Sequence, residues 1–106
     1  MTLPWREHPA ATDELLDAIR HYGRRQAGLG EEFAAEVARS IKDIQWKPEA
    51  WQRFPGWNRL PVVRSRRVDV FPYRIVYFVR DDDEIVIVAY AATARRPGYW
   101  KQRVDG

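Results

Sequence analysis

Residues 73–93, YRIVYFVRDDDEIVIVAYAAT, decide the fold that this sequence predicts. Residues 73–80 and 84–93 are rich in β-branched and aromatic side chains, a composition typical of strands. The three Asp residues 81–83 separate the two runs and form an acidic turn. The second run is apolar at nearly every position, which indicates an interior strand that is covered on both faces.

Side chains of a strand alternate between its two faces, so residues 73–80 have one uncharged face and one charged face. The uncharged face consists of Tyr73, Ile75, Tyr77 and Val79. We expect this face to pack against helices. The opposite face carries Arg74 and Arg80 and is expected to look outward or into a groove.

Two amphipathic helices are predicted upstream of these strands. Thr12 is expected to be the N-cap of the first helix, and helical spacing relates its apolar residues Leu15, Ile19 and Tyr22. The Gly-Leu-Gly segment at residues 28–30 ends this helix. The second helix spans about residues 31–47 and ends before Pro48. The short connection between them implies an antiparallel helical hairpin.

The remaining segments predict further strands and a loop. Residues 3–8 are expected to form a short first strand, and the Arg-rich residues 62–70 form a strand before residue 73. Residues 48–61, PEAWQRFPGWNRLP, hold three Pro and one Gly and predict a loop. Residues 98–103 predict a short helix or tail. Three aromatic side chains of the loop are expected to pack partly on the core: Trp51, Phe54 and Trp57.

These elements predict an α+β fold in which residues 1–106 form a single domain. A short N-terminal strand and an antiparallel helical hairpin precede a three-stranded antiparallel meander. All strands join one sheet, and the helices pack on one of its faces.

The composition excludes several classes of site. The chain has no cysteine, so a disulfide scaffold, a Cys-ligated zinc site and a thiol nucleophile are all excluded. His8 and His21 lack ligand spacing, so neither a metal nor another cofactor is expected. No apolar run reaches the roughly 18 residues that span a bilayer, and the first residues lack a signal-peptide pattern. We therefore expect a cytoplasmic protein with no membrane partner.

Charge is distributed unevenly along the chain. The net charge is +3, and 15 of the 18 basic residues are Arg. Residues 1–52 carry 7 basic and 9 acidic side chains, whereas residues 53–106 carry 11 basic and 6 acidic ones. A basic half favours an anionic partner such as nucleic acid. The alternative is that Arg-rich composition reflects a genome of high GC content.

Arginines and aromatic residues of the C-terminal half form the candidate site. An arginine cluster can hold a phosphodiester and stabilise charge that develops on it, and an aromatic ring can stack on a base. The candidate catalytic residues are Arg67, Arg74, Arg95 and Tyr99. The candidate residues for binding nucleic acid or another target are Arg64, Arg66, Arg96 and Trp100. The alternative is that these arginines are solvated at strand edges and the aromatic rings belong to the core.

Three segments, in this order and spacing, carry a resemblance to a known family. They are FPYRIVY at residues 71–77, DDDEIVIVA at residues 81–89 and ARRPGYW at residues 94–100. Together they resemble the C-terminal half of RelE/ParE-family toxins of type II toxin–antitoxin systems, a family that includes plasmid-stabilisation proteins. The predicted first strand and helical hairpin are in register with that family, so the resemblance covers nearly the whole chain.

The resemblance implies a growth-inhibiting toxin that a cognate antitoxin binds and neutralises. RelE-like members cut mRNA on the ribosome without a metal, whereas ParE-like members poison DNA gyrase. Arg74 matches the position of a catalytic Arg in RelE-like toxins, and Arg67 falls where those toxins place a strand Lys. Arg95 is similar to their Arg after the last strand, and Tyr99 lies within about one position of their terminal Tyr.

Two departures favour a ParE-like function. Thr93 stands where many relatives have His, and no Glu or His is available as an obvious general base. Arginine is too basic to accept a proton near neutral pH. We therefore expect a gyrase-directed toxin rather than an enzyme. The alternatives are a ribosome-dependent mRNA endonuclease, a decayed toxin that only binds its partner, and a general RNA-binding domain.

Overall fold

The computed structural model describes residues 2–105. Its elements in chain order are β1 (Trp5–Glu7), α1 (Pro9–Arg25), α2 (Leu29–Trp46), the short 3-10 helix η1 (Pro48–Ala50), β2 (Gln52–Arg53), β3 (Val63–Arg67), β4 (Tyr73–Arg80), β5 (Glu84–Ala92) and α3 (Lys101–Asp105). The predicted α+β class, the helical hairpin and the β3–β4–β5 meander are confirmed.

The sheet differs from the prediction at both edges, and its strand order is β1-β5-β4-β3-β2. β1 pairs with β5 in parallel, so the sheet is mixed rather than antiparallel. The meander leaves one edge of β5 open, and β1 fills it, with the Ile85 amide donating to the Pro4 carbonyl and the His8 amide to the Ile87 carbonyl. At the other edge the short β2, within the predicted loop, pairs with β3.

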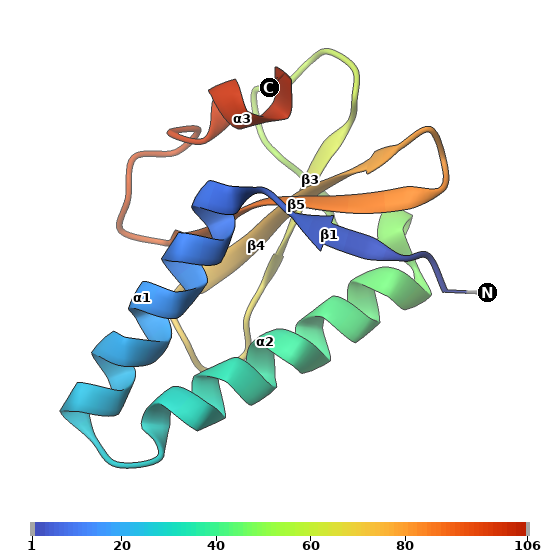
Figure 1. Cartoon of the computed structure of the whole chain (residues 1–106). Coiled ribbons are helices and arrows are strands. Elements are labelled where there is room, and N and C mark those ends of the chain that lie inside the picture. Colours follow the sequence, from blue (N-terminus) through green and yellow to red (C-terminus); the bar gives the residue numbers. More distant parts are fainter. Residues whose placement is uncertain (1, 106) are drawn as a thin grey trace.

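The uncharged face of β4 lies under the helical hairpin, as the alternation predicted. Ile75 and Tyr77 are fully buried in a core that includes Phe33 and Ile44 of α2. Figure 1 shows α1 and α2 on the same side of the sheet. The two helices come close at Gly30, where a Cβ would lie 2.5 Å from the Ile19 carbonyl oxygen.

A second cluster covers part of the opposite face. Val76, Phe78 and Val88 of the sheet pack there against Trp100, which is 1% exposed, and against Val104 of α3. Phe54 and Trp57 join this cluster and Trp51 joins the first one, so the expectation that the loop aromatics pack on the core is confirmed. Figure 1 shows α3 on the other side of the sheet from the hairpin.

Helix α1 begins earlier than predicted. His8, not Thr12, is its N-cap, and its Nδ1 accepts a hydrogen bond from the Ala10 amide at 3.0 Å. Pro9 follows at the first helical position, where its fixed φ and missing N–H are tolerated. Thr12 instead lies in the first turn and donates to the Glu7 carboxylate. This earlier start places Glu14 one turn deeper in the helix than the sequence suggested.

Candidate functional site

The alternation of β3 divides its arginines between the two faces of the sheet. Arg67 is the cross-strand partner of Arg74, and both lie on the face opposite the hairpin. The Arg74 Nε donates to the Ser65 Oγ at 2.9 Å. Partial burial, and then the nearby Arg67 charge, lower the pKa of Arg74. Within residues 2–105 neither guanidinium forms an ion pair.

Arg64 and Arg66 lie on the hairpin side. The Arg64 Nη1 donates to the Trp51 carbonyl at 2.9 Å. Arg66 is only 8% exposed and donates to the Asp43 carboxylate at 2.7 Å and to the Ser40 hydroxyl at 2.8 Å. These contacts fasten β3 to α2, so the geometry leaves Arg66 little capacity to bind a partner.

The C-terminal segment is fixed by its own contacts. The Arg95 guanidinium stacks on the Tyr99 ring at 3.7 Å and lies 3.6 Å from the Glu14 carboxylate. Arg96 is exposed. Trp100 packs on Phe54, with ring centroids 4.8 Å apart, so its ring faces protein rather than solvent.

Glu14 is the residue that organises this segment. Its carboxylate accepts hydrogen bonds from the Tyr99 hydroxyl at 2.6 Å, from the Tyr90 amide at 3.1 Å, and from both terminal nitrogens of Arg103 at 3.0 and 3.1 Å. One side chain of α1 thereby holds β5 and the segment that follows it. The sequence signal for this role is the position of Glu14 on the buried stripe of α1, between Ala11 and Ala18.

Two hollows meet at Arg74. One, of about 320 Å³, is lined by Arg67 and Asp69 among others, and one of about 160 Å³ is lined by Arg95, Arg96 and Tyr99 among others. Arg74 and Ser65 line both. Five arginines line the two hollows, and one of them, Arg66, is already bound to α2. The other four border one continuous surface, which we name the basic strip: Arg67, Arg74, Arg95 and Arg96.

The basic strip offers cations and hydrogen-bond donors but little to accept a proton. Burial, and then the hydrogen bond to Glu14, raise the pKa of Tyr99 well above its usual range. Its hydroxyl already donates its proton to that carboxylate. Among the described residues that line the two hollows, Asp69 is the one carboxylate. The arrangement suits binding of an anion better than proton transfer.

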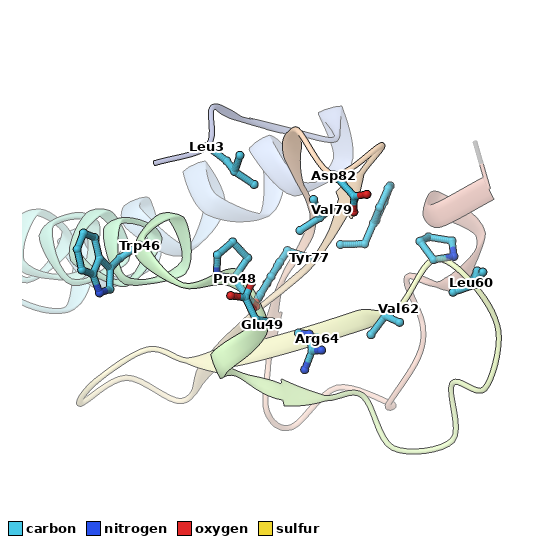
Figure 2. Close-up of a pocket in the computed structure, with 12 residues that line it drawn as sticks. Leu3, Trp46, Pro48, Glu49, Leu60, Val62, Arg64, Tyr77, Val79 and Asp82 are labelled. Atoms are coloured by element: carbon cyan, nitrogen blue, oxygen red, sulfur yellow. The ribbon is translucent and has the colours of Figure 1, made fainter. Parts of the chain in front are cut away.

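A larger cavity lies elsewhere, and the sequence did not indicate it. This open groove of about 840 Å³ is lined by four separate segments (Figure 2). Apolar side chains dominate it, among them Leu3, Trp46 and Leu60, the last two being 75% and 81% exposed. Arg64 is its one cation within the described residues. At its base the Tyr77 hydroxyl donates to the Pro48 carbonyl.

Residues 2–105 contain neither a candidate metal cluster nor a helix able to span a membrane. No group of three or more His, Asp or Glu side chains there could hold a metal ion. No helix there has both the length and the apolar character needed to cross a membrane.

Comparison with known proteins identifies a family and similar solved structures. A family model described as the ParE toxin of the type II toxin–antitoxin system parDE matches residues 6–96. A solved structure described as the chromosomal ParDE toxin–antitoxin system from P. aeruginosa has a similar fold, with a TM-score of 0.67 at 17% identity. That similarity covers 86% of this chain and 96% of the other. The search of curated proteins returned no match.

Proposed function

This chain belongs to the ParE toxin family of type II toxin–antitoxin systems, and from that premise we propose that it inhibits growth by acting on DNA gyrase. In this proposal residues 1–106 act in the cytoplasm as one toxin domain, without a cofactor. A cognate antitoxin binds the toxin and neutralises it, and the pair would serve plasmid stabilisation or a chromosomal equivalent.

The state of Tyr99 is the observation that favours gyrase over mRNA cleavage. A nuclease that works without a metal needs a group that accepts the proton of the attacking hydroxyl. Tyr99 is held as a donor to Glu14, and its raised pKa keeps it protonated at neutral pH. The arginines of the basic strip cannot take that proton either. A toxin that binds its target is therefore the better match to this geometry.

The groove in Figure 2 is the surface that we assign to the antitoxin. Its exposed Trp46 and Leu60 would be covered by the apolar side of an amphipathic segment, and Arg64 and Glu49, which also line the groove, would bind the polar side. Recognition of an amphipathic segment by an apolar groove follows the usual pattern of peptide binding.

Expression of the chain alone in a bacterial host tests the proposal. Growth should stop, and DNA–gyrase cleavage complexes should accumulate while total mRNA remains intact. Co-expression of the protein encoded by the neighbouring gene should restore growth. Normal growth at high soluble expression would contradict a toxin and would instead favour a decayed module that only binds its partner.

The ribosome-dependent nuclease is the second candidate because the basic strip places Arg67 and Arg74 side by side. It predicts mRNA cleavage that requires ribosomes. Arg74→Ala should then lower cleavage by at least 100-fold, since an arginine on the transferring phosphate typically contributes that much. Arg20→Ala, an exposed change on α1, is the control. Unchanged cleavage in Arg74→Ala would exclude this residue from catalysis, and binding of free RNA that falls steeply with salt would favour a general RNA-binding domain.

A further inference from the structure

Val70 has a backbone conformation that valine rarely adopts. Its φ is 75°, in the left-handed region, although the side chain is β-branched. Glycine or asparagine would adopt this φ at a lower energetic cost. Residues in such unfavourable conformations persist only where the surrounding structure imposes them, and they are found most often at functional sites.

Two buried neighbours hold Val70 in this conformation. Val68 and Phe71, on either side of the tip of the β3–β4 loop, both belong to the main core. The Phe71 ring packs edge-on against Tyr22 and Phe33, with centroids 5.0 Å from each. The chain must reverse between these two anchors, and Val70 takes the strained position of the reversal.

The Val70 side chain does not stabilise the fold by packing against other residues. It is 89% exposed, more than any other large apolar side chain among the described residues. A polar residue would be better solvated there, and a glycine would relax the backbone. The local structure therefore accounts for the positive φ but not for the choice of valine.

The base of the same loop carries a second unfavourable feature. Arg67 ends β3 and Arg74 lies directly opposite it on β4. Like charges opposed across two strands destabilise a sheet. Asp69, the carboxylate of the loop, is exposed and forms no ion pair with either arginine within residues 2–105. An apolar tip and two uncompensated cations thus share one end of the molecule.

We propose that this end, defined by Val70, Arg67 and Arg74, is the surface through which the toxin contacts its protein target. Val70 enters an apolar hollow on the target, and the two arginines pair with carboxylates around that hollow. The inference rests on the proposed function and names the contact surface for it. Nucleic acid would use the arginines but would leave the valine in water, so the exposed valine favours a protein.

The position of this surface separates it from the groove assigned to the antitoxin. Arg74 and the loop lie at the start of β4, whereas the groove is lined by Tyr77, Phe78 and Val79 in its second half. Variants at the loop should therefore affect the target and leave antitoxin binding unchanged.

Val70→Asn is the main test, with purified DNA gyrase as the probe. The variant should lower gyrase affinity by at least 10-fold, because an apolar anchor is lost. Its Tm should rise by about 4 °C, since asparagine tolerates the left-handed region. The double variant Arg67→Ala with Arg74→Ala should also weaken gyrase binding and should reduce the dependence of binding on salt concentration. Leu16→Asn, at an apolar position of α1 that is 43% exposed, is the control and should bind as the wild type.

Three results would contradict the proposed contact surface. If Val70→Asn binds gyrase as the wild type does, or if its Tm falls, the contact surface proposed here is wrong, while gyrase remains the proposed target. A wild-type chain that fails to bind gyrase overturns the target, and this surface with it. If free duplex DNA or RNA binds and only the arginine variant loses it, the surface is a nucleic-acid site and the proposal is wrong.

Discussion

Two arginines that follow β5, Arg95 and Arg103, and the two arginines at the β3–β4 end have opposite surroundings. Arg95 lies near Glu14, and Arg103 is bound by it through two hydrogen bonds. Arg67 and Arg74 face each other without an ion pair within residues 2–105. The first pair of arginines holds elements of the fold together, whereas the second pair carries charge that the fold does not neutralise within residues 2–105. A count of basic residues in the sequence does not distinguish these uses.

Glu14→Ala should have the largest effect on this contrast. It removes the acceptor for Tyr99 and the partner of Arg103, whose side chain is 18% exposed. A charge left without its partner in that position costs about 3–4 kcal/mol of unfolding free energy. Urea denaturation measures the change. Asp17→Ala, which breaks an exposed pair with Arg20, is the matched control and should change stability little. Equal effects of the two changes would contradict the role given to Glu14.

Arg66→Ala and Arg67→Ala test the contrast between two adjacent residues. Arg66→Ala removes hydrogen bonds to Ser40 and Asp43 and should cost about 2 kcal/mol. Arg67→Ala removes a cation that repels Arg74 and should be neutral or stabilising by a few tenths of a kcal/mol. Thermal unfolding of the two variants side by side gives the comparison. A larger loss for Arg67→Ala would reverse the assignment of the two faces.

The alternation of side chains between the two faces of a strand could be predicted from the sequence, and it correctly indicated which face of β4 packs against the helices. Residues 73–80 form β4 as predicted, and their uncharged face lies under the hairpin because period two assigns side chains to faces. The same rule separates Arg66 from Arg67. It could not show that Asp43 and Ser40 of α2 meet Arg66, because that contact depends on how the helices pack.

Other features depend on contacts that are distant in the sequence. The role of Glu14 depends on residues 76 to 89 positions later, and a carboxylate in the first turns of a helix has a simpler reading as a favourable charge near the helix dipole. The parallel pairing of β1 with β5 required knowledge of which sheet edge was free. The strain at Val70 was hidden because nothing in Val-Asp-Val indicates a left-handed residue.

Tyr99→Phe removes a single hydrogen bond from the contacts that Glu14 makes with the segment after β5. Loss of the hydrogen bond to Glu14 should cost about 1 kcal/mol at neutral pH. The pKa of Tyr99 is raised above 10.0, its usual value, so the protonated folded state is favoured. This stability is fully present below pH 10 and is lost as pH rises through the higher folded value. Denaturation at several alkaline pH values should therefore show a smaller loss for Tyr99→Phe than for the wild type. An identical alkaline loss would mean that the other tyrosines account for it.

The pairing of β1 with β5 also has a consequence for the order in which the chain is made. Trp5 aligns with Ile85, so β1 cannot pair until β5, the last strand in the sequence, has been synthesised. Until then the first strand has no partner, and the surface of α1 that faces β5 remains open. Long-range pairings of this kind slow folding. The nascent chain therefore spends most of its synthesis without its finished sheet, and β1 can take its place only after residue 87 has been made.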